Sequence, residues 1–367
     1  MDTLSPELMR LIRDKNKLSL SSSHDSISRI GGSLAVYCRA DLENKKVVEV
    51  ASMATLFKGY ESLLRGRDLN DVGRVSSMAS GICGGVHATA SALCLEMALG
   101  LKPPPLGIVL RNLLLSCQYL NDNSMHLFIL AGPDYSQQVI EATNPEIWQK
   151  AKQTPCQAPT IHGFKRVGDI MLGLNKGEGC LYKLAMKMAS LARQAYTLLG
   201  GKYPHSESII PGGVSLPVEL ETLKQFNILL QPFAEYSQKT AAIWNDIFDF
   251  MLAANSRYED LGKCPVSLLD FGQWDHPDYY DASYKNCDQW GQKRWSTPAA
   301  IIEGELACVT LSKLNSGMEE FLDYSFQTGV SLPVDKLIKR DPLGNPIFHA
   351  PLSEPQTESK KFDSQFD

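Results

Sequence analysis

The sequence has 367 residues, with 36 Lys and Arg against 41 Asp and Glu, a formal net charge of −5, and 44% apolar residues. This balance excludes a largely disordered chain, because enough Leu, Ile, Val and Phe are present to offset the entropy lost on ordering. It also excludes nucleic acid as a partner, because no run of Lys and Arg is longer than a pair. We therefore expect a globular protein with a sizeable core.

The most apolar stretches, residues 106–115 and 241–254, are both interrupted by charged residues. Neither reaches the ~20 apolar residues that span a bilayer. Residues 1–17 lack the basic start and the apolar block of a secretory signal. The sequence therefore predicts no transmembrane segment and a cytoplasmic protein, with any attachment to a membrane made through a partner.

The first part of the chain predicts a β-hairpin after a polar start. Residues 1–25 are polar and are expected to form a flexible lead-in. Apolar residues then alternate over 34–38 and recur over 47–50, on either side of a polar turn at 43–45. This alternation is typical of two paired strands.

Three later stretches carry the apolar spacing of packed helices. The first covers residues 106–117, and the second covers 181–199, where a Gly-Gly pair is expected to end it. The third runs from 218 to 254 and is expected to break or kink at Pro232.

The segment 264–310 is aromatic and polar. We expect Trp274, Trp290 and Trp295 to pack a lid or an interface rather than to bind a cofactor. A second hairpin is expected around the turn at residues 303–305.

These elements predict an α+β fold that is dominated by helices. Long packed helices would form one core, with a few β-hairpins at its periphery. The main domain is expected to cover residues 26–340, after the lead-in and before a polar tail over 341–367.

Nine cysteines are present, and no two of them are separated by only two residues. A zinc ribbon or a four-cysteine iron–sulfur site of paired spacing is therefore not expected. A disulfide framework is not expected in a reducing compartment.

The most unusual segment is Ser80–Ser91, which reads SGICGGVHATAS. Its glycines exclude a helix interior at the start, whereas the Ala-rich continuation predicts a helix. Cys83 is therefore expected near a helix N-terminus, which favours a thiolate, with His87 one turn later on the same face. Such a pair can hold a soft metal or act as nucleophile and base. The alternative is that Cys83 is a small buried apolar residue and His87 a hydrogen-bonded core residue.

The run Ser80-Gly81-Ile82-Cys83-x-x-x-His87 resembles the first metal-binding motif of nickel–iron hydrogenase large subunits, Cys-Gly-x-Cys-x-x-x-His. The likeness continues in chain order over about residues 28–350 and looks closest to the branch of uptake enzymes that oxidise trace hydrogen. The segments that carry it are Arg29-Ile30, Phe57–Glu61, Arg65–Asp68, Lys102–Pro104, His205, Pro211–Val214, Tyr279–Asp281, Trp290-Gly291, Thr297-Pro298 and Asp341–Pro346.

The resemblance implies oxidation of H2 at a nickel–iron centre, with electrons passed to an iron–sulfur small subunit. It implies that Cys83 is the ligand that bridges nickel and iron and that His87 hydrogen-bonds close to that position. Glu61 would lie near the metal and either transfer protons or hold a structural cation; the other reading of Glu61 is a surface or helix-capping carboxylate. For His205 a role in anchoring a loop is expected rather than metal ligation.

The sequence departs from the family pattern at the metal ligands. Ser80 stands at the position of the first cysteine, and no cysteine follows Cys308, so the second Cys-x-x-Cys pair is not in these 367 residues. Gly31 also stands where many members have a proton-transferring glutamate.

These departures leave three readings of the chain. In the first, the chain is part of a hydrogenase large subunit and is not active alone, because a second polypeptide must supply the missing cysteine pair; its partner is an iron–sulfur small subunit or a second large-subunit fragment. In the second, the chain is a non-catalytic assembly scaffold or structural companion that holds only iron, as a cofactor precursor. In the third, it is an interaction protein with a degenerate pocket.

Overall fold

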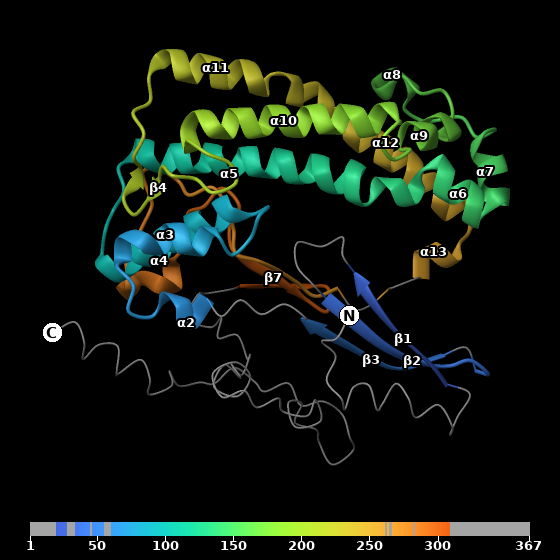
Figure 1. Cartoon of the computed structure of the whole chain (residues 1–367), viewed down its shortest axis with the longest axis horizontal. Helices are drawn as coiled ribbons and strands as arrows, with labels where there is room; N and C mark the ends of the chain where they lie inside the picture. The colour runs from blue at the N-terminus through green and yellow to red at the C-terminus, as the bar shows by residue number, and fades with distance from the viewer. Residues whose placement is uncertain are drawn as a thin grey trace. The chain divides into compact units, whose positions relative to one another are not determined.

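The computed structural model describes residues 20–27, 34–44, 46–54, 60–260, 263, 266–281 and 283–308. The chain divides into two compact units, one of residues 1–65 with 309–367 and one of residues 66–308 (Figure 1). The predicted tail and the first part of the predicted lead-in fall outside the described residues, and the domain limits stay predictions.

The first unit contains an antiparallel three-stranded sheet and a short helix. The strands are β1 (Leu20–Ile27), β2 (Leu34–Asp41) and β3 (Lys46–Ala54), in that order across the sheet, and the helix is α2 (Tyr60–Leu64). The predicted hairpin is confirmed as β2 and β3. The strand β1 was not predicted, and the flexible lead-in expected over residues 1–25 is wrong for its last part: these Ser-rich residues carry little apolar alternation and are ordered by backbone pairing with β2.

The turn between β2 and β3 is closed by the side chain of Asp41. Its Oδ1 accepts hydrogen bonds from the backbone N–H groups of Glu43 and Asn44, at 3.0 and 3.1 Å. An aspartate that bonds to the backbone two or three residues later is a common way to start a tight turn. The polar residues between the strands therefore determine where the hairpin reverses.

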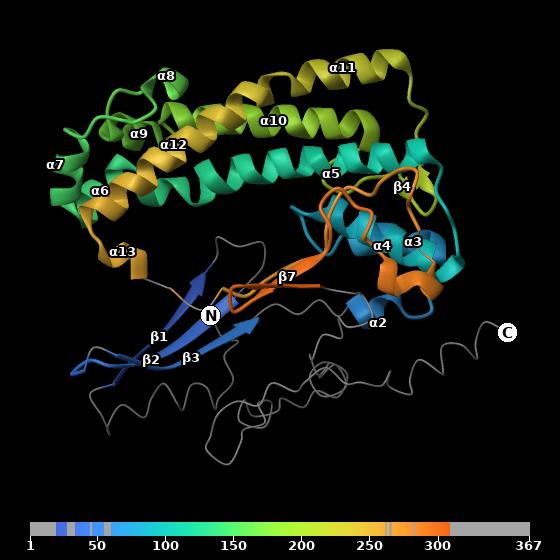
Figure 2. The same ribbon diagram turned by 180° about the vertical axis from the view of Figure 1, so that it is seen from behind.

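The second unit is mainly helical, and Figures 1 and 2 show α10 lying between α5 and α11. Its α-helices are α3 (Leu69–Ser77), α4 (Gly84–Leu99), α5 (Pro105–Met125), α6 (Gln137–Thr143), α7 (Pro145–Ala151), α8 (Pro159–His162), α9 (Val167–Gly173), α10 (Cys180–Gly200), α11 (Leu220–Leu230), α12 (Pro232–Ala254) and α13 (Arg257–Asp260). A π-helical turn, η1 (His126–Leu130), follows α5, and 3-10 turns occupy η2 (Gly132–Tyr135) and η3 (Tyr284–Gln289). The helix-dominated α+β fold is confirmed.

Two small sheets complete the second unit. They are β4 (Ile209–Ile210) with β5 (Gly213–Val214), and β6 (Leu268–Asp270) with β7 (Ala299–Ile302) and β8 (Glu305–Cys308). The hairpin predicted around residues 303–305 is confirmed as β7 and β8. The other three strands were missed, because two or three residues are too few to show a period.

The packing of α5 against α10 follows from their apolar faces. Leu114 and Cys117 of α5 are buried against Ala195 and Leu199 of α10. The two predicted helical stretches are thus confirmed, and α10 ends at Gly201, whose positive φ of 75° suits glycine. No helix among the described residues is long and apolar enough to cross a membrane.

The third predicted helical stretch is divided at Pro232, as expected. The helix α11 ends at Leu230, and Pro232 is the first residue of α12, where its missing N–H is not needed. The α12 helix then buries Trp244 and Ile247 in a core that it shares with α9.

Candidate functional site

The glycine-rich loop, residues 80–83, connects α3 to α4, and Ser80 holds its turn. The Ser80 hydroxyl oxygen accepts hydrogen bonds from the backbone N–H groups of Ile82 and Cys83, both at 3.2 Å. Serine commonly closes such turns, because its side chain reaches the backbone two and three residues later. Ser80 therefore acts as the cap of this loop.

Cys83 is the N-cap residue of α4, which confirms the prediction that it lies at a helix N-terminus. Its carbonyl oxygen accepts from the N–H groups of Val86 and His87, at 3.1 and 3.3 Å, and so begins the helix. The side chain is half-buried. A helix N-terminus favours negative charge, so this thiol lies where an anionic ligand atom is stabilised.

Two glycines allow the loop to lie close to its surroundings. A Cβ atom on Gly84 would come within 2.6 Å of His205 Nδ1, and one on Gly85 would come within 2.7 Å of Gln118 Oε1 and closer still to the hydroxyl of Tyr196. Any other residue would push these side chains away. The Gly-Gly pair is therefore required by packing and not by a turn.

Polar side chains anchor both ends of the loop. Gln118 Nε2 and the Tyr203 hydroxyl both donate to the carbonyl oxygen of Ile82, at 3.2 and 3.4 Å. His205 Nδ1 lies 3.0 Å from the carbonyl oxygen of Ser77 and 3.1 Å from its hydroxyl. His205 thus has the loop-anchoring position that the sequence predicted.

The remaining predicted site residues have different surroundings. His87 is exposed on the first turn of α4, so it is not the buried core residue of the alternative reading. Cys83 is half-buried, and the alternative of a fully buried apolar residue is wrong for it too. Glu61 belongs to α2 in the other unit, and its side chain lies outside the described residues.

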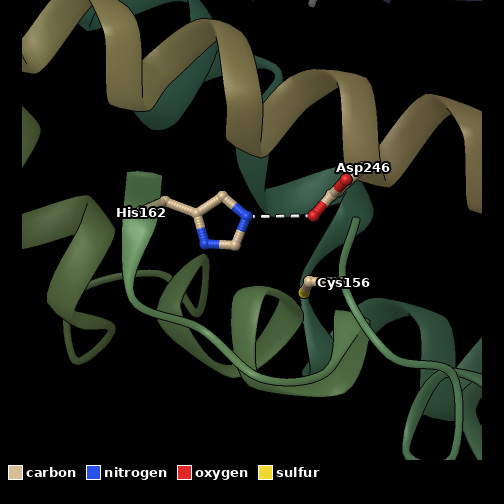
Figure 3. A group of neighbouring side chains, drawn as sticks. All are labelled: Cys156, His162 and Asp246. Atoms are coloured by element: carbon tan, nitrogen blue, oxygen red, sulfur yellow. Dashed lines mark hydrogen bonds and ion pairs between the residues drawn. The ribbon is translucent and has the colours of Figure 1, made fainter. Parts of the chain in front are cut away.

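A second group of reactive side chains lies far from the loop and was not predicted from the sequence. Cys156, His162 and Asp246 are buried, and one ligand atom of each lies within 4.8 Å of the others (Figure 3). Asp246 comes from α12, whereas Cys156 and His162 lie before and at the end of α8. Their separation in the sequence hides the group from any motif.

The Asp246 carboxylate is the acceptor for this whole group. It receives hydrogen bonds from the N–H groups of Gln157 and Ala158, from His162 Nε2 at 2.9 Å, and from the Cys156 thiol. Burial alone would raise the pKa of Asp246, but the bonds from His162, Ala158 and Gln157 outweigh it and hold that pKa below its usual value. Burial and the Asp246 charge raise the pKa of Cys156 to about 12, so its thiol stays protonated.

The tautomer of His162 shows that this group is a structural junction. The N–H of Phe164 donates to His162 Nδ1 at 3.1 Å, so the ring proton of the neutral imidazole lies on Nε2 and points to Asp246. A metal on Nε2 would move that proton to Nδ1, against the Phe164 N–H. The arrangement therefore ties the loop before α8 to α12 and does not fit a metal.

Known proteins are similar to this chain over a part that includes the glycine-rich loop. A family model described as nickel-dependent hydrogenase matches residues 58–163. The actinobacterial-type NiFe-hydrogenase from Ralstonia eutropha H16 superposes with a TM-score of 0.78 at 29% identity, over 92% of this chain and 60% of that chain. The chain is thus similar to nickel-dependent hydrogenases.

Other hydrogenases match over shorter parts. The periplasmic NiFeSe hydrogenase large subunit of Desulfomicrobium baculatum is 24% identical over 70% of this chain and 48% of its own length. The hydrogenase-1 large chain of Escherichia coli K12 is 36% identical over 30% of this chain and 18% of its own length. The chain thus spans about half or less of the length of these curated relatives.

The loop fits a hydrogenase metal centre only in part. Resemblance implies thiolate ligands at the positions of Ser80 and Cys83, and Cys83 supplies one on a half-buried helix N-terminus. Ser80 supplies a hard oxygen, and its two lone pairs already accept backbone N–H groups. The donor set of this loop therefore does not fit a complete nickel site.

Proposed function

We propose that this hydrogenase-like chain binds a transition metal through the Cys83 thiolate and takes part in oxidation of H2 only together with other polypeptides. The observation that carries this proposal is the position of Cys83, a half-buried thiol at the N-cap of α4 beside two tightly packed glycines. A thiolate there gains from the positive end of the helix dipole.

The nickel–iron centre of the family supplies the chemistry of H2 splitting when it is complete. The Ser80 oxygen does not fit that centre, because it already accepts two backbone N–H groups. The residues of this chain have simpler tasks in the proposal: Cys83 binds the metal, Ser80 fixes the loop, and His87 orients a ligand from its exposed place on α4. Glu61 is proposed as the carboxylate that transfers protons or holds a structural cation.

Partners follow from the same proposal. A second large-subunit fragment would supply the remaining ligands, and an iron–sulfur small subunit would accept the electrons. Support comes from the family match over residues 58–163 and from the exposed apolar side chains of Ile82 and Val86 next to Cys83. A cytoplasmic location remains a prediction from the sequence.

A second candidate function is favoured by the bonding of Ser80. Because its oxygen is used as a backbone cap, the loop offers a single soft donor, which suits temporary holding of iron better than nickel catalysis. In this reading the chain is an assembly scaffold, or a structural companion of a true large subunit, and carries an iron-containing cofactor precursor.

Metal analysis of the chain co-expressed with its genetic neighbours tests both functions. We expect stoichiometric metal in the wild-type protein and loss of that metal in Cys83→Ala. The matched control is Cys94→Ala, which removes an exposed thiol further along α4 and is expected to leave the metal content unchanged.

The identity of the metal and the activity separate the two functions. Nickel with iron, together with H2-dependent reduction of a dye, supports the hydrogenase function and excludes the scaffold. Iron without nickel, and no dye reduction, supports the scaffold. Metal that is retained in Cys83→Ala contradicts both.

A further inference from the structure

A large cavity lies within the second unit on the side of α4 and α5. Its volume is about 710 Å³, and its walls are α4, α5, residues 271–275, Trp290 and Arg294. This volume is in the range of sites for small organic ligands. Neither the hydrogenase family motif nor the proposed metal function assigns a ligand to it.

Both arginines on the cavity wall are already neutralised. Arg111 forms an ion pair with the buried Glu96, with N–O distances of 2.9 and 3.1 Å. Arg294 forms an ion pair with Asp275, at 2.7 and 3.3 Å, and its guanidinium also stacks on the ring of Trp290. The cavity therefore offers no free arginine to an anion such as a phosphate or a nucleotide.

Asp122 is the acidic group of the cavity that lacks a cationic partner in the described ion pairs. Its Oδ1 accepts from Asn121 Nδ2 at 2.8 Å, and that amide also donates to the Tyr203 hydroxyl. Burial raises the pKa of Asp122, so a negative charge there is costly without a counter-ion. His126, the first residue of η1, also lines the cavity.

Aromatic rings line the same cavity as this carboxylate. Tyr119 and Trp274 lie with ring centroids 6.0 Å apart, and Trp274 is fixed by a bond from its Nε1 to Ser116 Oγ at 3.0 Å. Phe271 and Trp290 line the same cavity. Aromatic faces attract cations as well as apolar groups. Trp274 and Trp290, which the sequence predicted to pack a lid or an interface, thus both lie on the wall of this cavity.

We propose that this cavity binds a small organic cation, an amidinium, guanidinium or ammonium group on an apolar body, with Asp122 as its counter-ion. The charged group lies against the Asp122 carboxylate, and the body lies between the aromatic rings and the apolar residues of α4. A neutral or anionic molecule of the same shape lacks the ion pair and binds more weakly.

The experiment compares three probes of nearly the same shape on the full chain purified with its partners. Benzamidine carries the cation, benzamide is its neutral analogue, and benzoate is its anionic analogue. Titration calorimetry is expected to give benzamidine an affinity about tenfold or more above that of benzamide, with no binding of benzoate. Equal affinity for benzamidine and benzamide would overturn the proposal without any variant.

Asp122→Asn tests the counter-ion. The variant is expected to lower the affinity for benzamidine to that for benzamide, whereas the control Asp249→Asn, at an exposed carboxylate on α12, leaves it unchanged. If Asp122→Asn does not fold, Trp274→Leu provides the second variant and is expected to weaken both probes. Unchanged benzamidine affinity in a folded Asp122→Asn protein would also overturn the proposal.

The pH dependence gives an independent readout. Since the pKa of Asp122 is raised, its charge is lost at a higher pH than for an ordinary aspartate, and benzamidine affinity is expected to fall there. The other titratable or charged groups nearby are His126, Tyr203 and Arg193, and burial raises the pKa of Tyr203 to about 12. The variant His126→Gln removes any contribution of the histidine to the pH dependence. An unchanged pH profile of benzamidine affinity in that variant assigns the titration to Asp122.

The source of the cation is distinguished by a further probe. N-acetyl-arginine amide carries the same charge as the side chain of a partner protein. Binding of this probe at the strength of benzamidine assigns the cavity to an arginine side chain, and binding of benzamidine alone assigns it to a free small molecule. Binding of neither contradicts the proposal.

Discussion

Ser80 stands at a position where the resemblance implies a metal ligand, but its oxygen has a structural role instead. It accepts two backbone N–H groups, one from Ile82 and one from Cys83. A thiol at this position would accept those hydrogen bonds more weakly and would leave its sulfur available to a metal. Serine in place of cysteine at this position therefore strengthens the hydrogen bonds that close the loop and removes a soft metal ligand.

Ser80→Ala is expected to destabilise the protein by about 1 kcal/mol, because two N–H groups at the start of α4 lose their acceptor. The measurement is the midpoint of urea unfolding at an unchanged slope. Ser237→Ala, at an exposed serine on α12 that donates only to the carbonyl of Ala234, is the control and is expected to have almost no effect. Equal midpoints for wild type and Ser80→Ala would contradict the capping role.

At the scale of elements, one carboxylate joins segments that are far apart in the sequence. Asp246 on α12 receives the N–H groups of Gln157 and Ala158 and the ring of His162, so it holds the segment around α8 against the long helix. Because the accepting group is buried, loss of its charge would leave several donors poorly matched. The junction therefore depends on one side chain of α12, that of Asp246.

Asp246→Asn is expected to lower the free energy of unfolding by about 2 kcal/mol at neutral pH. The pKa of Asp246 is lower in the folded protein than in the unfolded chain, so its contribution is present above the ordinary value of 3.8 and is lost as the pH falls through the folded-state pKa. Unfolding curves of both proteins at a series of pH values should therefore converge in acid.

The control for this prediction is Asp249→Asn, one turn away on α12 and exposed, where the change is expected to be below about 0.5 kcal/mol. A difference between wild type and Asp246→Asn that stays constant down to strongly acidic pH would show that the charge of Asp246 does not stabilise the fold.

At the scale of the whole molecule, the chain matches only part of larger proteins. It covers 60% of the Ralstonia eutropha hydrogenase chain and 48% of the Desulfomicrobium baculatum large subunit. Apolar side chains such as Met78, Ile82 and Val86 are exposed around the glycine-rich loop. Exposed apolar groups of this kind are typical of surfaces that a partner covers.

The chain expressed alone is therefore expected to self-associate, and size-exclusion chromatography with light scattering measures this. Ile82→Gln, at a side chain that is 51% exposed, is expected to reduce the association. Leu252→Gln, 44% exposed on α12, is the control and is expected to change it less. A monomer that melts cooperatively without any partner would contradict this expectation.

Much of the fold follows from local patterns in the sequence. The apolar spacing of α5 and α10, the break at Pro232 and the two hairpins were predictable, because each depends on residues close together in the chain. The same holds for Cys83 at the start of α4, because the Ala-rich residues after it favour a helix, although Gly84 and Gly85, which were expected to exclude one, lie in the first turn of α4.

The contacts across the fold could not be predicted. Nothing local connects Gln118 or Tyr203 to the carbonyl of Ile82, or His162 to Asp246, which are 84 residues apart. The preference of the cavity for a cation at Asp122 also depends on the ion pairs that neutralise Arg111 and Arg294, and these pairs form only in the folded chain. Such partners are determined by how the helices pack, and the sequence carries no periodic signal of that packing.

The oxygen of Ser80 has one more consequence, for the order of assembly. A loop whose turn is closed by its own hydroxyl keeps that turn without any ion. On the proposed function, a metal would therefore bind to a loop that already has its shape.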